Sequence, residues 1–360
     1  MRKLVIYTVG VFLSLLLAVS CSNPTNSDSG SPFIEEPGDG SPANPYRIST
    51  AEQLSAVRGG QTGYEDWTLS DCYKLTADID LSGYTTGAGW DPIGEAGNSF
   101  TGSFDGNGHK ITGLTIYGTE NYQGLFRSID SSGSISNLGI ENVNVIGPRY
   151  VGALAGTSKG TITHCYSTGM VIADERFGGG LVGGMTGGTI SQCYSSASVS
   201  GEERIGGLIG YIDQLVTISE SYATGPVKTT SSIGSFKGGF VGILLKDASG
   251  SITNCYATGD VNGANYLAGF VGSIVDASLF IKNCYATGKI IGSESASHLG
   301  GFSGSPGNID SCYYDTQTTG KNDTIGAAGV STADMKTQST FSGWDFDTVW
   351  AINADEYPHL

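Results

Sequence analysis

Two pairs of acidic residues recur at equivalent places in a repeated sequence pattern, where they could act on a glycosidic bond. Asp174–Glu175 in "DERFGGG" and Glu202–Glu203 in "EERIGGL" lie eight and nine residues after a tyrosine. If consecutive repeats stack as strands roughly 4.8 Å apart, Asp174 lies over Glu202 and Glu175 over Glu203. That separation is close to the roughly 5–5.5 Å between the carboxylates of a retaining glycosidase. An arginine follows each pair, and the next repeat has "TTSSIG" instead, so the pattern favours a solvated polar turn.

Other catalytic and metal-binding patterns are incomplete. The four histidines do not form the H-E-x-x-H motif of metallopeptidases. Ser158 in "GTSKG" fits G-x-S-x-G, but its repeat context lacks the strand-to-helix turn of a nucleophile elbow. "DIDLSG", with Asp78 and Asp80, resembles the start of a calcium loop, yet Gly89 stands where a bidentate Glu is needed. We predict no enzyme activity and no cofactor, with calcium near these aspartates as an alternative to an ordinary turn.

A repeat of about 28 residues sets the position of all these side chains. Its most regular motif is Cys-Tyr followed by two small residues, with the tyrosines 28, 28, 34, 29 and 28 residues apart. A glycine-rich motif such as "GGGLVGG" or "GGFVG" lies between them. The segments are short, rich in Val, Ile, Thr and Tyr, and bounded by Gly, Asn and Ser, which predicts strands. A fixed short period of strands predicts an all-β solenoid.

Alternation along "GSISNLGIENVNV" and "GSITNCYATGDV" predicts which side chains face the core. Leu138 and Ile140 should point inward, and alignment on the preceding Asn puts Cys255 and Ala257 in their places. The cysteines then stack inside the solenoid, with Ser221 in one place: Cys165, Cys193, Cys255, Cys284 and Cys312. In-register strands hold facing Cβ atoms near roughly 4.8 Å, beyond the roughly 3.5–4.5 Å of disulfides. We therefore predict free buried thiols.

The same alternation points the tyrosines outward, as a stripe along the solenoid. Stacked phenol rings could simply cover the strands, or they could bind a glycan or the edge of a protein. The candidate ligand-binding residues are Tyr194, Tyr222, Tyr256 and Tyr285.

These repeats resemble the GLUG-motif repeats of bacterial surface proteins. The resemblance is carried by "GGLVG" segments followed by "I-x-x-C-Y-A-T-G", by the preceding "FTGSFDGNGHKITGLTI", and by the tail "GVSTADMKTQSTFSGWDF". It covers residues 43–360 and implies a right-handed parallel β-helix on the cell surface. Such repeats occur in surface adhesins and in IgA-cleaving metallopeptidases. Because this chain lacks the metallopeptidase motif, the resemblance reaches only the repeat portion of those enzymes.

The N-terminus has the pattern of a bacterial lipoprotein signal. Arg2 and Lys3 precede a short apolar stretch that ends in "LAVSC", which resembles a lipobox with Cys21 as the lipidated residue. We predict a signal peptide over residues 1–20 and a flexible Ser-, Asn- and Pro-rich tether over 21–42. An N-terminal cap with the first coils should occupy 43–121, the GLUG-like β-helix 122–323, and a C-terminal cap 324–360.

The ends of a solenoid need protection from further strand pairing. Ser49 in "STAEQLSAV" and Ser331 in "STADMKTQ" each stand three residues before an acid, which predicts a short capping helix at each end. Four aromatic residues of the tail should form an apolar lid on the last coil: Trp344, Phe346, Trp350 and Tyr357.

Composition narrows the function. A formal charge of −16 argues against nucleic acid as a partner. We predict an exported, lipid-anchored monomer at the outer membrane or cell surface of a bacterium, attached to the membrane through its lipid. Its predicted role is adhesion to, or recognition of, a host or environmental glycan or protein. A polysaccharide hydrolase or lyase and a passive envelope stalk remain alternatives.

Overall fold

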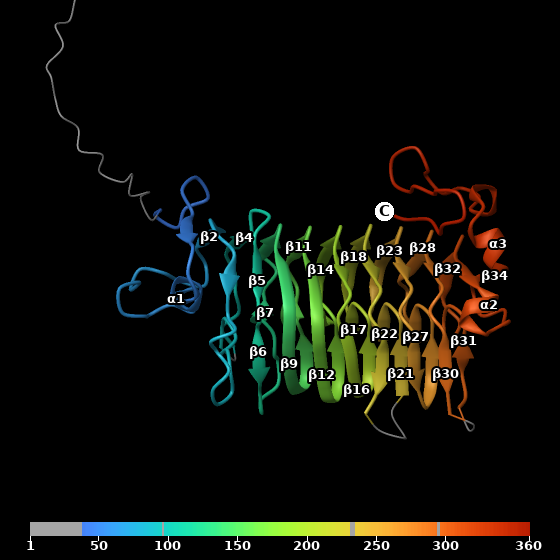
Figure 1. Ribbon diagram of the computed structural model, residues 1–360, viewed down its shortest axis with the longest axis horizontal. Coiled ribbons are helices and arrows are strands. Elements are labelled where there is room, and N and C mark those ends of the chain that lie inside the picture. Colours follow the sequence, from blue (N-terminus) through green and yellow to red (C-terminus); the bar gives the residue numbers. More distant parts are fainter. Residues whose placement is uncertain (1–37, 96, 231–234, 294–295) are drawn as a thin grey trace, which may run out of the picture. The chain divides into compact units, whose positions relative to one another are not determined.

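The repeats wind into a right-handed parallel β-helix of about nine turns, as the sequence predicts (Figure 1). The computed structural model describes residues 38–95, 97–230, 235–293 and 296–360, which belong to one compact unit. Each full turn contributes strands to three sheets, and the ladders between successive turns are parallel. Each turn therefore packs mainly on the turn before it and the turn after it.

The first sheet has ten strands within the described residues. From Ile135 onward its inward central position is an isoleucine in every turn, so one column of branched side chains fills this side of the core. Its strands are β1 Tyr46–Ile48, β2 Cys72–Leu75, β4 Ser103–Asp105, β8 Ser134–Ser136, β11 Thr161–Thr163, β14 Gly188–Ser191, β18 Leu215–Ser219, β23 Ser249–Thr253, β28 Phe280–Lys282 and β32 Asn308–Asp310.

A single left-handed residue turns the chain from the first sheet into the second. Asn254 and Asn283 have φ of 54° and 53°, and His164 takes the same conformation at 52°. Asparagine enters this region more readily than most residues, which explains why it often precedes Cys-Tyr. The cysteine that follows is buried in every repeat, so the predicted inward column is confirmed.

The second sheet carries the tyrosine stripe, and the third carries the glycine-rich motifs. The second sheet consists of β3 Ile79–Asp80, β5 Lys110–Thr112, β6 Thr115–Tyr117, β9 Gly139–Gly152, β12 Tyr166–Gly179, β15 Tyr194–Ser195, β16 Ser198–Gly206, β19 Tyr222–Ala223, β20 Val227–Thr229, β21 Ser235–Gly238, β24 Tyr256–Ala257, β25 Val261–Gly263, β26 Asn265–Ala268, β29 Tyr285–Ala286, β30 Ile290–Gly292, β31 Leu299–Gly300, β33 Tyr313–Asp315 and β34 Ala328–Val330. The third consists of β7 Phe126–Ile129, β10 Ala155–Ser158, β13 Val182–Met185, β17 Ile209–Ile212, β22 Val241–Leu244 and β27 Val271–Ile274.

The two repeat motifs meet inside the solenoid. A Cβ on Gly239 of "GGFVG" would lie 2.1 Å from the carbonyl oxygen of Gly269 and 3.0 Å from the Cβ of Ala257 in "CYATG". Only a glycine opposite a small residue fits this gap. The motifs therefore recur together because each leaves room for the other.

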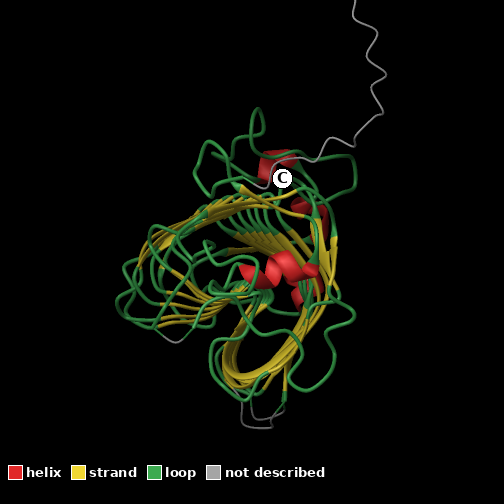
Figure 2. Ribbon diagram, turned by 90° about the vertical axis from the view of Figure 1, so that its left-hand side faces the viewer, coloured by secondary structure: helices red, strands yellow, loops and turns green. Residues whose placement is uncertain are grey.

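Short helices lie near both ends of the solenoid, as predicted. Helix α1, Ala51–Ala56, crosses the N-terminal end in the axial view (Figure 2), and its N-cap is Thr50 rather than Ser49. Helix α3, Thr332–Met335, begins at the predicted cap Ser331, whose Oγ accepts from the amide of Asp334 at 3.1 Å. Helix α2, Thr316–Thr319, and a 3-10 turn, Gln338–Thr340, complete the C-terminal region. No helix in the described part is long and apolar enough to cross a bilayer.

The predicted apolar lid is in a different place. Trp344 and Trp350 pack with Phe341 and Met335 against Tyr285, on the outer face of the second sheet rather than on the open end of the last coil. The chain after α3 folds back along the outside of the solenoid (Figure 1). The tyrosine stripe is an apolar surface, and the aromatic rings of the C-terminal segment are stabilised by being buried against it.

Candidate functional site

The tyrosine stripe is a continuous stack of phenol rings. Tyr166, Tyr194, Tyr222, Tyr256 and Tyr285 follow one another with centroids 4.9, 4.7, 4.7 and 5.0 Å apart and interplanar angles of 3–8°. Both ring faces of the inner members are covered by their neighbours. The stack therefore presents ring edges and hydroxyl groups, not ring faces, to a ligand.

The C-terminal segment covers the later part of this stack. Tyr285 is 2% exposed, donates to the carbonyl oxygen of Pro358 at 2.7 Å, and burial raises its pKa well above the usual value. Trp350 lies 6.2 Å from Tyr256, between ring centroids. Of the four predicted ligand-binding tyrosines, Tyr285 is inaccessible and Tyr256 is partly covered. Tyr194 and Tyr222 remain partly exposed.

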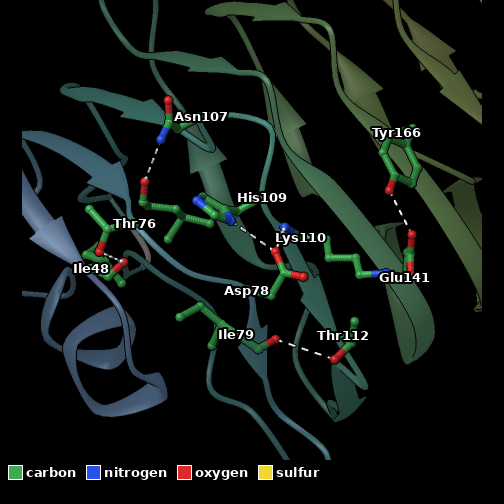
Figure 3. A network of polar contacts seen from close by, with 11 residues as sticks. Ile48, Thr76, Asp78, Ile79, Asn107, His109, Lys110, Thr112, Glu141 and Tyr166 are labelled. Carbon is green, nitrogen blue, oxygen red and sulfur yellow. Dashed lines mark hydrogen bonds and ion pairs between the residues drawn. The ribbon is translucent and has the colours of Figure 1, made fainter.

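A polar network anchors the first ring of the stack (Figure 3). Tyr166 donates to Glu141 at 2.7 Å, and the Lys110 ammonium lies 3.0 Å from the other carboxylate oxygen. The Tyr166 hydroxyl and then Lys110 hold the pKa of Glu141 below its usual range. These contacts stabilise the charged carboxylate, so they favour a structural role for this network.

Asp78 belongs to the same region but faces other partners. Its carboxylate accepts from the Lys110 amide at 3.2 Å and lies 3.1 Å from Nδ1 of His109, whereas Asp80 accepts from the Ser82 amide at 2.8 Å. No group of three His, Cys, Asp or Glu suited to a metal ion occurs among the described residues. Calcium binding near the two aspartates stays a hypothesis.

The carboxylate cluster does not have the predicted alignment. Strand β12 carries one extra residue between Ala173 and Arg176 relative to both neighbouring turns, so Arg176 is paired with Glu203. Asp174 and Glu175 therefore both lie opposite Glu202, and Glu175 does not stand over Glu203. A β-bulge of this kind follows from a residue count that differs between turns. Glu175 instead forms an ion pair with Arg149.

Lys237 next to this cluster was missed by the sequence analysis. It is fully buried, donates from Nζ to the backbone carbonyl of Glu202 at 2.8 Å, and burial lowers its pKa to about 8. Its position could have been read from the sequence, because Lys237 stands two residues before the second glycine of "KGGF", as Ile205 does in "IGGL". Lys237 is paired with Ile205 in the second sheet, and both side chains point into the core.

A second stack of side chains was also missed. It contains five aromatic residues, one arginine and one histidine, and every member has positive φ: Tyr122, Tyr150, Phe177, Arg204, Phe236, Tyr266 and His298. Tyr122, Tyr150 and Phe177 stack at 4.6 and 4.7 Å, the Arg204 guanidinium lies 5.0 Å from Phe177, and Tyr266 stacks on His298 at 4.1 Å. Each member stands two residues before a small residue, Gly or Ala, of a glycine-rich motif. This spacing could have shown from the sequence that the seven side chains lie at equivalent positions.

The remaining predicted positions take structural places. Ser158 is buried in β10, and its Oγ accepts from the Gly160 amide at 3.1 Å. The repeat cysteines are free thiols in this structure, and Cys255 Sγ lies 3.2 Å from the carbonyl oxygen of Thr253. Their redox state after export stays a prediction.

Comparison with known proteins supports the repeat assignment. The model of the GLUG motif matches residues 238–262, which run from the glycine pair of one repeat through its Cys-Tyr motif. The resemblance inferred from the sequence is thus confirmed, and the chain is a β-helix protein that carries the GLUG motif.

The proteins that are similar to this chain include two sequence relatives and one solved structure. A protein of Evansella cellulosilytica, provisionally named a Gly-rich membrane protein, is 34% identical over 89% of this chain and 45% of its own length. Halomucin of Haloquadratum walsbyi is 38% identical over 39% of this chain and 2% of its own length. A Bacteroides ovatus protein, provisionally named an immunoglobulin A1 protease, has a crystal structure that matches with a TM-score of 0.59 and 21% identity, over 89% of this chain and 94% of that one. At that identity the match shows the fold alone. The chain spans less than half the length of the two sequence relatives.

Proposed function

We propose that this protein is a lipid-anchored cell-surface recognition module without catalytic activity, which binds a glycan or protein through its outer face. The observation that carries the proposal is the row of phenol hydroxyls at Tyr194 and Tyr222, which the C-terminal segment leaves uncovered. The names of the two sequence relatives, a membrane protein and halomucin, are consistent with a surface location. Ser158 is buried, Glu175 is paired with Arg149 and Glu203 with Arg204, and these contacts give no support to a hydrolase.

The anchor is tested at Cys21, which lies outside the described residues. We expect Cys21→Ser to abolish fatty-acid labelling and to move the protein from the membrane fraction to the soluble exported fraction. Cys72→Ser, at another free cysteine, serves as the matched control and should leave labelling intact. An unlabelled wild-type protein, shown by intact mass, would contradict the anchor.

The phenol row is tested by removing hydroxyls while keeping rings. We expect Tyr194→Phe with Tyr222→Phe to leave the thermal melt within a few degrees of wild type, because the ring stack persists. Attachment to the ligand found in a glycan and matrix-protein screen should fall about tenfold, since two hydroxyl hydrogen bonds of about 0.5–1.5 kcal/mol each are lost.

Tyr285→Phe is the control for this test, because Tyr285 is covered and its hydroxyl bonds within the chain. It should reduce stability slightly and leave attachment per folded molecule unchanged. Unchanged attachment in the double variant would show that the stack only covers the strands. A screen without any ligand would favour a passive stalk.

A further inference from the structure

Two hollows adjoin over the N-terminal turns of the solenoid, with Arg127 lining both. The first, of about 300 Å³, is lined by Trp90, Glu120 and Gln123. The second, of about 320 Å³, is lined by Tyr122, Thr157 and other hydroxyl-bearing residues. Neither hollow lies at the tyrosine stripe or the carboxylate cluster, and the second one adjoins the start of the second side-chain stack at Tyr122.

Tyr122 gives the second hollow an aromatic surface. It is the first member of the second side-chain stack, so one ring face packs on Tyr150 at 4.6 Å, while 37% of the residue is exposed. Among the aromatic rings of that stack, it is the one that lines a hollow with hydroxyl groups within the described residues. Thr157 donates to Ser128 at 3.2 Å, and its oxygen can accept from a ligand.

Trp90 lines the first hollow but is itself almost fully buried, at 1% exposed. Its indole N–H has no hydrogen-bond partner among the described groups, and its nitrogen has almost no accessible surface. A ligand in the hollow therefore does not reach this N–H.

Charges of both signs line the two hollows: Arg127 and Lys159 lie among Asp91, Glu95 and Glu120. Arg127 lies 3.3 Å from a carboxylate oxygen of Glu120 and 3.9 Å from one of Asp91. The chain as a whole carries −16, which disfavours an anionic polymer. The lining mixes ring surface with donors and acceptors and has no purely apolar socket for a peptide side chain.

We propose that these two hollows form a binding site for a neutral oligosaccharide, with one sugar ring packed on Tyr122 and its hydroxyl groups bonded to the hydroxyl-bearing residues beside it, such as Thr157. Sugar hydroxyls both donate and accept, which matches this lining, and the C–H face of a pyranose packs on an aromatic ring. This site is separate from the phenol row at Tyr194 and Tyr222, so an experiment can contradict one of the two proposals and leave the other standing.

The test measures binding of cellohexaose, maltohexaose, laminarihexaose and mannohexaose to the full chain by calorimetry and tryptophan fluorescence. We expect one of them to bind. Tyr122→Asn should weaken it at least tenfold, because asparagine keeps the left-handed backbone but removes the ring. Trp90→Phe should reduce the fluorescence response and leave affinity within about twofold, because the indole N–H does not reach the ligand. Tyr266→Asn, at the same place in the stack but outside the hollows, should leave affinity unchanged.

Melting curves of all three variants accompany the measurements, so that loss of folding is not taken for loss of binding. Absence of binding by all four hexasaccharides to the folded wild type at millimolar concentration would overturn the proposal. So would binding that a folded Tyr122→Asn leaves intact, or a preference for the anionic polymer alginate over every neutral hexasaccharide.

Discussion

Cys255→Asp should strongly destabilise the solenoid. Cys255 is completely buried, between the equivalent positions of the turns before and after it. An aspartate there places an uncompensated charge in a packed core, which we expect to cost about 4 kcal/mol or more of unfolding free energy. Urea unfolding followed by circular dichroism measures the loss.

Two milder changes at Cys255 separate charge from polarity and size. Cys255→Ser should be well tolerated, because Ser221 already occupies this place one turn earlier and donates to the Ser219 carbonyl at 2.7 Å. Cys255→Ala should cost about 1 kcal/mol, through lost packing. If the aspartate variant is no less stable than the alanine variant, the placement of Cys255 in a buried column is contradicted.

Lys237→Met should stabilise the protein by about 3 kcal/mol at pH 7. The lysine pKa is about 8 in the folded chain against 10.5 for an ordinary lysine, and each unit corresponds to about 1.36 kcal/mol. The cause is burial, which the carboxylates of Glu203 and Glu202 only partly offset. Methionine has a similar shape and needs no hydration.

The stability gained by Lys237→Met should decrease as pH rises. Below pH 8 the lysine is charged in both states, so the folded state bears the full cost. Between pH 8 and 10.5 the folded state releases its proton while the unfolded state keeps it, so wild-type stability rises relative to the methionine variant. The difference between the two proteins should therefore fall by more than half between pH 7 and about pH 9.5, and approach zero above pH 10.5.

Other groups also titrate in this pH range, but their contributions to stability cancel in the difference between wild type and Lys237→Met. Burial raises the pKa of Cys165, Cys284 and Tyr285, and these groups lower the stability of both proteins at high pH. Lys228→Met, at an exposed lysine of β20, should change stability by less than about 0.5 kcal/mol at every pH. A constant difference between wild type and Lys237→Met across the range would refute the buried charge.

The positions that the sequence predicted well are those set by local rules. Cys255 and Ala257 face the core and Tyr256 faces out because side chains alternate along a strand, and an asparagine before Cys-Tyr supplies the left-handed corner. Both rules act within a few residues. Lys237 could have been placed by counting from its glycine pair, yet nothing local shows that an inward lysine can reach the Glu202 carbonyl.

The sequence by itself thus determined the repeat, the solenoid, the inward cysteines and the outward tyrosines, because these follow from strand periodicity and turn preference. The tertiary structure alone decided three other things. It placed the C-terminal aromatic residues over Tyr285, it shifted Glu175 out of alignment with Glu203 by a bulge in β12, and it put Trp90 and Tyr122 beside adjoining hollows. Each depends on how segments distant along the chain pack against one another, which short-range patterns do not encode.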